Sequence, residues 1–346
     1  MKFKILIFAG SLALVAAAAV WLAVLHKQRE ASALLTAQKS AAPATMVDSE
    51  EIRALKAQIK ASPNDEPLQI KLAGMYFQSG RYGDSEQLYR EIVGLNPKSE
   101  GGYLGLGNVL RYRGKYDESE KAFLAALALD PGNSENYVEL GKLYRNWNKY
   151  PQAEAALKKA IELNPKNDLL YSYGLGYLYR DEGKLDQAVK MFQQALLLSP
   201  SAFNYMGMGD IYRDTGKFAD SEKMFQKALA LDPKSEAYLG LGYLYMDERQ
   251  NGKAEQAFKN YLEKIKPKSE VYNGLGYIYL QEKRFSEAED VFLKSVAINP
   301  KLDGYLGLGQ VYIAEAKTAE AKAALEKELA ENPASSTAQE LLKQMQ

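Results

Sequence analysis

The residue types that carry out nucleophilic, acid–base or metal chemistry are sparse in this sequence. Its 346 residues include no cysteine and a single histidine, His26. Without a thiolate or a second imidazole, the chain can build no thiol nucleophile, no histidine-based triad and no cysteine or histidine zinc site. Adjacent carboxylates do occur, such as Asp181 with Glu182 and Glu118 near Glu120. We expect them at helix ends and turns, where they face solvent or complement a helix dipole.

Paired glycines such as Gly105 and Gly107 are the other candidate chemical motif, because glycine-rich loops cradle phosphates. A phosphate-binding loop follows a strand and carries a third glycine and a basic ligand, and these pairs lie inside a helical pattern without them. We therefore predict no enzyme activity, no cofactor and no metal. The 44 lysines and arginines equal the 44 acidic residues, so we also predict no nucleic-acid partner.

The elements that position these residues are set by a proline that returns through most of the chain. Successive positions differ by 33, 34 or 35 residues, and they are Pro63, Pro97, Pro131, Pro165, Pro200, Pro233, Pro267, Pro300 and Pro333. A fixed period of this size marks an array of repeats. Each repeat contacts only its neighbours, so the array offers a long surface and no inherited active site.

Each repeat carries two stretches of apolar residues at helical spacing. In one repeat the first stretch holds Tyr137, Leu140 and Tyr144, and the second holds Ala153 and Leu157. We predict a helix A and a helix B, which reverse direction at a turn that often contains Gly-Lys. The proline supplies no backbone N–H and ends helix B.

This pattern of aromatic–Leu-Gly–Tyr followed by Ala–Phe–Ala–Pro resembles the tetratricopeptide repeat. The resemblance covers eight repeats over residues 64–333, and it implies an all-α fold, a right-handed α-solenoid of helix-turn-helix units. Apolar residues at helical spacing also predict capping helices, a half-repeat over 51–63 and a C-terminal helix over 334–346. The resemblance specifies the fold and not the function, because such repeats serve many unrelated partners.

The first residues of the chain predict a membrane segment. An uncharged, mostly apolar run covers residues 5–25, with Lys2 and Lys4 before it and Lys27 after it. At about 1.5 Å per residue, a helix of this length spans about 30 Å, the thickness of a bilayer core. We therefore predict a signal anchor over residues 1–29 that crosses the lipid bilayer once.

The anchor decides the predicted location. With the N-terminus inside, which the flanking charges favour, the repeats are extracytoplasmic, and periplasmic in a bacterium. Residues 30–50, rich in small and polar residues, indicate a flexible tether, and His26 is expected at the membrane interface. Cleavage at the Ala17-x-Ala19 sequence is the alternative and would release a secreted protein.

The resemblance also implies where a partner binds, since helix A lines most of the concave groove in this family. The last Tyr of the aromatic–Leu-Gly–Tyr pattern, such as Tyr144, is here called the recurrent Tyr. The residue after this position gives the series Arg111, Arg145, Arg180 and Arg213. Two positions before that Tyr stand Asn108, Lys142, Tyr177, Asp210, Tyr243, Tyr277 and Gln310. An earlier position holds Leu104, Val138, Tyr173, Met206, Leu239, Asn273 and Leu306. The candidate partner-binding residues are Arg111, Arg145, Arg180, Arg213, Asn108, Tyr173, Tyr177, Asp210, Tyr243 and Tyr277.

Two interpretations of the four arginines stay open. In the first, each pairs with a neighbouring acid such as Asp181 or Asp214 and only solvates the groove wall. In the second, a ladder of guanidinium groups grips carboxylates, acidic peptide segments or an anionic glycan. The tyrosines off the core pattern add contact area with a hydrogen-bonding tip. The apolar residues of the earliest series depart from the Lys and Asn clamp that docks chaperone C-termini in some repeat proteins.

The leading hypothesis is a non-enzymatic, membrane-tethered scaffold that binds a protein or peptide segment in envelope assembly, secretion or pilus biogenesis. A role in polysaccharide export, in which the groove contacts a glycan or its synthase, is a second hypothesis. Self-assembly into a homo-oligomer is a third.

Overall fold

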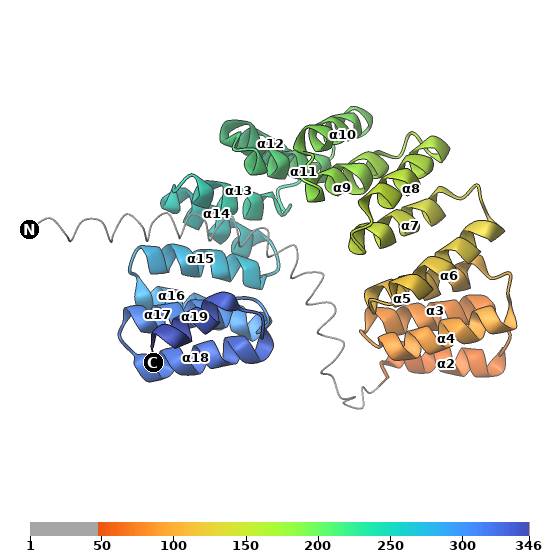
Figure 1. Cartoon of the computed structure of the whole chain (residues 1–346), viewed down its shortest axis with the longest axis horizontal. Coiled ribbons are helices and arrows are strands. Elements are labelled where there is room, and N and C mark those ends of the chain that lie inside the picture. The colour runs from red at the N-terminus through yellow and green to blue at the C-terminus, as the bar shows by residue number, and fades with distance from the viewer. Residues whose placement is uncertain (1–47, 346) are drawn as a thin grey trace, which may run out of the picture. The chain divides into compact units, whose positions relative to one another are not determined.

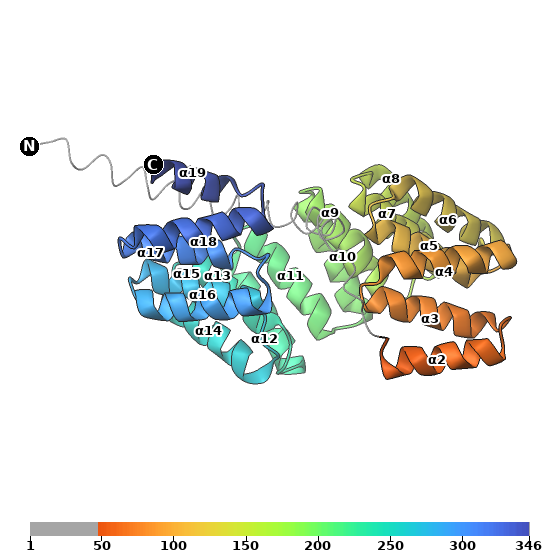
Figure 2. The ribbon, with the colours of Figure 1, turned by 90° about the horizontal axis from the view of Figure 1, so that it is seen from below.

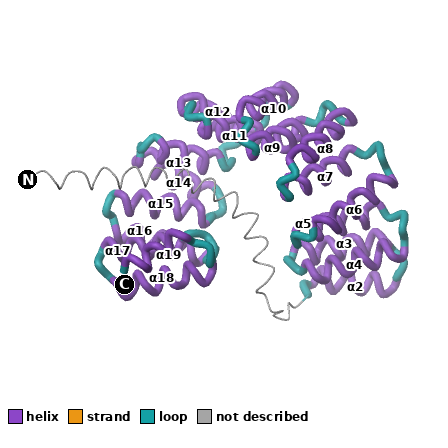
Figure 3. Tube along the Cα trace, viewed as in Figure 1, coloured by secondary structure: helices purple, strands orange, loops and turns teal. Residues whose placement is uncertain are grey.

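The computed structural model describes residues 48–345, and within this range every regular element is a helix (Figure 1, Figure 3). The all-α repeat architecture predicted from the sequence is therefore confirmed. The predicted signal anchor over 1–29 and almost all of the tether over 30–50 lie outside the described residues. Between residues 48 and 345, no helix combines the length and the apolar character that a bilayer crossing needs.

The chain divides into two compact units, and the division falls between Leu178 and Tyr179. The helices of the first unit are α2 (Glu50–Ala61), α3 (Glu66–Gln78), α4 (Tyr82–Leu95), α5 (Glu100–Tyr112), α6 (Tyr116–Leu129), α7 (Ser134–Asn146), α8 (Tyr150–Leu163) and the π-helix η1 (Leu170–Gly176). The short helix α9 (Tyr177–Asp181) contains the division. Figure 2 shows α2, α3 and α4 side by side in the first unit.

The second unit continues the alternation of helix A and helix B. Its helices are α10 (Leu185–Leu198), α11 (Ala202–Asp214), α12 (Phe218–Leu231), α13 (Ala237–Asp247), α14 (Asn251–Lys264), α15 (Ser269–Gln281), α16 (Phe285–Ile298), α17 (Gly304–Ala314), α18 (Thr318–Glu331) and α19 (Ser336–Gln344). Helix α19 packs on α18 at the end of the array (Figure 1).

Polar residues shortly after the prolines start several of the A helices. The side chain of Ser99 accepts a hydrogen bond from the backbone N–H of Gly102 at 2.9 Å, and Asp65 accepts one from Leu68 at 3.1 Å. Each cap satisfies an N–H that the helix itself leaves unpaired, which is worth about 1 kcal/mol. In these repeats the polar residue after the proline therefore fixes where the next helix A begins.

The turn from helix A to helix B places one residue in the left-handed region. Gly114 occupies it with φ +70°, and the following N–H of Lys115 bonds back to the carbonyl of Leu110 at 2.9 Å. In the second unit, Lys283 and Ala316 hold the same conformation, with φ of 61° and 58°. A residue with a Cβ is strained there by about 1 kcal/mol, so these two turns are less favourable than the glycine turns.

A recurring aromatic interlock joins each repeat to the next. One residue of helix B, here called the plug residue, packs in most repeats against a glycine of its own helix A, a glycine of the following helix A, or both. Phe258 is fully buried, and a Cβ added to Gly274 of the next repeat would lie 2.6 Å from its ring. The glycine pairs therefore make room for a ring, which explains why they recur despite their cost to helix stability. The plug residues are Tyr89, Phe123, Leu157, Phe192, Phe225, Phe258, Phe292 and Leu325.

Side-chain hydrogen bonds reinforce this packing within and between repeats. The hydroxyl of Ser119 in helix B donates to the carbonyl of Gly107 in helix A of the same repeat, at 2.7 Å. Between repeats, the recurrent Tyr donates to a glutamate of the preceding helix B, as Tyr144 does to Glu120 at 2.6 Å. These bonds recur at the repeat period and hold neighbouring helices in a fixed register.

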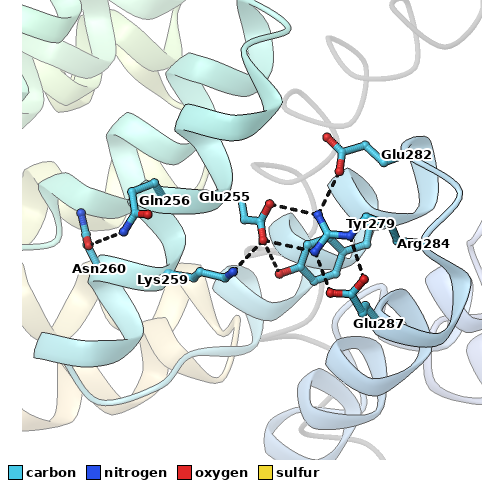
Figure 4. A network of polar contacts seen from close by, with 8 residues as sticks. All are labelled: Glu255, Gln256, Lys259, Asn260, Tyr279, Glu282, Arg284 and Glu287. Atoms are coloured by element: carbon cyan, nitrogen blue, oxygen red, sulfur yellow. Dashed lines mark hydrogen bonds and ion pairs between the residues drawn. The ribbon is translucent and has the colours of Figure 1, made fainter.

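Around Glu255 the contact between repeats is a network of hydrogen bonds and ion pairs. Figure 4 shows the Glu255 carboxylate at the centre of this network, between α14 and α15. It accepts a hydrogen bond from Tyr279 at 2.9 Å and pairs with Arg284 at 3.0 Å and Lys259 at 2.7 Å. The hydrogen bond from Arg284, opposed by burial, lowers the pKa of Glu255 to about 2. The guanidinium of Arg284 also lies over the Tyr279 ring, 4.0 Å from its centroid.

The π-helix η1 is the irregularity of the array. It falls in the repeat where successive prolines, Pro165 and Pro200, are 35 residues apart, the longest interval in the chain. The additional residue lies before Leu175, and helix A absorbs it by widening over Leu170–Gly176. Such single-turn π-segments inside helices are frequent at functional sites.

Candidate partner-binding surface

The residues of the three helix-A series predicted above to line a groove form what we call the helix-A surface. Each unit carries its own part of it. In the first unit, α5 places Asn108 and Arg111, α7 places Lys142 and Arg145, and η1 with α9 places Tyr173 and Tyr177.

Arg111 lies in an acidic and amide environment and is 12% exposed. Its guanidinium donates to the side-chain oxygen of Asn108 at 2.8 Å and lies 3.5 Å from the carboxylate of Glu139 on the next helix A. Lys142 donates to the same carboxylate at 2.6 Å. Glu139 stands where most other repeats carry the first glycine of the pair, so this buried acid is a special feature of its repeat.

Arg145 is placed beside aromatic rings. Its guanidinium lies over the ring of Tyr177, 5.9 Å from the centroid, and Tyr177 packs edge to face with Tyr173 at 6.0 Å. Tyr173 is 47% exposed. This part of the surface therefore presents a cation and an exposed aromatic ring side by side, a combination that is favoured in binding surfaces.

In the second unit the arginines pair with acids. Arg180 donates to Asp214 at 2.6 Å and lies 3.7 Å from Asp210. Arg213 lies 3.6 Å from Asp247 and 3.8 Å from Asp214. The pairing that the first interpretation of the arginines predicted for Asp214 is thus present at Arg180. Burial raises the pKa of Asp247, while Arg213 acts to lower it.

The tyrosines of the second unit lie between core and surface. The ring of Tyr243 packs edge to face on Phe258 at 5.6 Å, and Tyr277 does the same on Phe292 at 5.2 Å. Arg213 lies over Tyr243, 5.8 Å from the ring centroid. Burial raises the pKa of Tyr243 above its ordinary value. Both tyrosines cover the plug residues and expose the rest of their surface.

Sequence reasoning named Asp214 as a partner of the arginines but missed Glu139 beside Arg111 and Asp247 beside Arg213. Asp247 follows Arg213 by 34 residues, one repeat, whereas Glu139 follows Arg111 by only 28 residues. The signal was present in the repeat period, because a residue one period ahead lies on the neighbouring helix A.

Within the described range 48–345, no group of three or more acidic or histidine side chains is arranged to hold a metal ion.

Comparison with protein families supports the repeat assignment. Models described as tetratricopeptide repeat match residues 99–166, 168–234, 206–270 and 269–302, which together span more than half of the chain. No curated protein sequence matches the chain. Repeats of this kind typically form non-catalytic scaffolds that bind protein or peptide partners.

Solved structures show the same fold at low sequence identity. The crystal structure of yeast Tom70 has a TM-score of 0.69 and 16% identity, and the match covers 99% of this chain and 74% of that one. A tetratricopeptide repeat protein from Parabacteroides merdae has a TM-score of 0.57 and 19% identity, over 71% of this chain and 98% of that one. The APC/C hetero-tetramer Cut9–Hcn1 has a TM-score of 0.55 and 19% identity, over 85% of this chain and only 58% of its match.

Proposed function

The chain belongs to the tetratricopeptide repeat family, and from this premise we propose that it is a non-enzymatic scaffold that binds an extended segment of a partner protein along its helix-A surface. We further propose that residues 5–25 tether it to a membrane, with the repeats on the extracytoplasmic side. Envelope assembly, secretion or pilus biogenesis is the setting that such a tether suggests.

The cluster of Arg145, Tyr173 and Tyr177 in the first unit is the observation that carries the binding proposal. Arginine and tyrosine are enriched in binding surfaces, and rings lose little conformational entropy when a partner covers them. Arg145 stands on α7, Tyr173 on η1 and Tyr177 at the start of α9, and α7 and η1 pack against each other and against α8. The surface is therefore organised before a partner arrives, which lowers the entropic cost of binding.

The tether proposal rests on the length and the lack of charge of residues 5–25. A membrane location would restrict the scaffold to partners that are made at, or pass through, the same membrane.

A site-specific photo-crosslinking experiment tests the binding proposal in the full chain. A photo-reactive phenylalanine analogue replaces Tyr173, and as a matched control it replaces Leu95, which is 76% exposed at the end of α4 in the same unit. We expect a discrete protein adduct from position 173 that is absent from position 95, with the crosslinked residues in one continuous partner segment. Equal adducts at both positions, or none at position 173, would contradict the proposal.

A further inference from the structure

A cavity of about 140 Å³ opens on the helix-A surface of the first unit, between α7 and η1. Val138, Leu157 and Leu170 form its apolar lining, and Tyr173 stands among its walls. Gly141 and Gly174, one from each helix, complete the lining next to Leu157. All of these residues belong to the first unit.

The cavity exists first because Leu157 replaces a ring. Five of the eight plug residues are phenylalanine, and each of these five is at least 99% buried. A Cβ at Gly174 would lie 3.2 Å from the nearest atom of Leu157, whereas one at Gly274 would lie 2.6 Å from the ring of Phe258. Leu157 packs closely on Gly141, at 2.7 Å from an added Cβ, but on the side of Gly174 it leaves room that a ring takes up in other repeats.

The π-helix is the second cause of the cavity. Residues aligned with Tyr173 in other repeats, such as Val138 and Leu306, are 8% and 3% exposed, whereas Tyr173 is 47% exposed. The additional residue of η1 turns this helix face by part of a turn, so that the Tyr173 ring borders the cavity instead of filling it. The leucine in place of a phenylalanine at Leu157 and the additional residue of η1 therefore occur at the same place in the array.

The rim of the cavity is cationic on balance. Lys142 and Arg145 line it together with one carboxylate, that of Glu135. Lys142 donates to Glu139 at 2.6 Å and lies 3.9 Å from Glu135, and Glu139, which is only 10% exposed, also faces Arg111 at 3.5 Å. An acidic group of a ligand beside the apolar pocket would therefore meet two cations and one acid.

We propose that this cavity takes a phenylalanine or leucine side chain of a partner segment, with an acidic residue adjacent to it in the partner sequence. The proposal rests on the proposed function and gives its partner a chemical identity. A side chain of the partner would fill the space beside Leu157 that a phenylalanine plug residue fills in other repeats. An apolar anchor in a fitted pocket beside a charged rim is the arrangement that carries most binding energy in protein interfaces.

Selection from a displayed library of random twelve-residue peptides on the full chain provides the probe. We expect the selected peptides to share a phenylalanine or leucine next to an aspartate or glutamate. Leu157→Phe, which fills the cavity as other repeats do, should weaken binding of a selected peptide about tenfold or more and leave the melting temperature unchanged or higher. Leu157→Met, which conserves volume, is the control and should keep the affinity.

Two further measurements keep the inference falsifiable. If Leu157→Phe does not fold, Tyr173→Ser removes the cavity wall at an exposed position and should weaken the same peptide. In a double-mutant cycle, replacing the peptide's phenylalanine by alanine should cost affinity for the wild type and little for Leu157→Phe.

The outcomes separate this inference from the function on which it rests. Selected peptides that bind the wild type and Leu157→Phe equally, or that share no apolar residue, would overturn the cavity assignment and leave the scaffold function standing. A chain that selects no peptide at all would overturn both.

Discussion

The two units are built from the same repeat but differ in how uniformly it is used. In the second unit one large cluster of buried residues extends from Phe225 to Ala324, and a small one holds Leu306, Leu325 and Ala338. In the first unit buried residues form smaller separate groups, such as Ile52 with Leu72 and Val138 with Leu170. Successive phenylalanine plug residues join most of the second unit into one large core, while departures from the pattern give the first unit its cavity and exposed aromatic ring.

The largest expected contrast comes from truncating plug residues. Phe258→Ala should lower the free energy of unfolding by about 4 kcal/mol, because it removes a fully buried ring and leaves a void. Leu157→Ala should cost about 2 kcal/mol, since a smaller side chain is lost beside space that is already open. Urea denaturation followed by circular dichroism measures both. Equal losses would mean that the cavity does not loosen the packing around Leu157.

A matched pair of glycine substitutions sharpens the same comparison. Gly274→Ala should cost about 2 kcal/mol, because its Cβ would lie 2.6 Å from the Phe258 ring and overpacking outweighs the gain in helix propensity. Gly174→Ala meets Leu157 at 3.2 Å, so the two effects should roughly cancel. Thermal melting of the two variants tests this, and a larger loss for Gly174→Ala would contradict it.

The tyrosine–glutamate hydrogen bonds between repeats predict that the stability of both units falls at alkaline pH. Burial and the bond to a glutamate raise the pKa of Tyr144 in the first unit and of Tyr312 in the second to about 12. A raised pKa favours the protonated phenol of the folded state, so this stabilisation is complete below pH 10 and is lost as the pH rises toward 12. Tyr312→Phe should flatten the alkaline fall in melting temperature. An unchanged alkaline profile would show that this bond does not contribute.

Stability at acidic pH depends on a pKa that is shifted in the opposite direction, downward. The pKa of Glu255 is lowered to about 2, from an ordinary value of 4.5, so its contribution is present above pH 4.5 and is lost as the pH falls toward 2. Glu255→Gln should therefore lower the melting temperature at pH 7 and make little difference at pH 2. Chemical shifts of the carboxylate carbon in a pH titration report the pKa directly, and a value near 4.5 would contradict the network drawn in Figure 4.

The smallest effect is expected at the turns. Ala316→Gly should raise the free energy of unfolding by about 0.5 kcal/mol, because glycine adopts the left-handed φ of 58° without strain. The reverse change at the first unit's Gly114, Gly114→Ala, should cost about 1 kcal/mol. Differential scanning calorimetry resolves both changes, and a stability loss in Ala316→Gly would mean that the methyl group makes an unseen contact.

Most of the fold could be predicted from the sequence because its information is repeated. The proline period, the Leu-Gly pairs and the Ala–Phe–Ala pattern each recur, so chance similarity at one position matters little. The four arginines were assigned to the right helices and Asp214 was named as a pairing acid, yet Glu139, the partner of Arg111, was found only in space. The cavity needed two local departures to be combined, Leu157 and the 35-residue interval, and nothing in either alone specifies an opening.

The interlock between a plug residue and the next glycine has a consequence for how such a chain can change its length in evolution. Deleting residues 234–267 would bring Phe225 against Gly274, the same kind of partner that it has now in Gly240. The second unit can therefore gain or lose whole repeats while every junction keeps its fit. The first unit cannot, because Glu139, Leu157 and η1 occur once each, and a duplication there would copy or separate them. Natural variation in repeat number should accordingly concentrate after Tyr179.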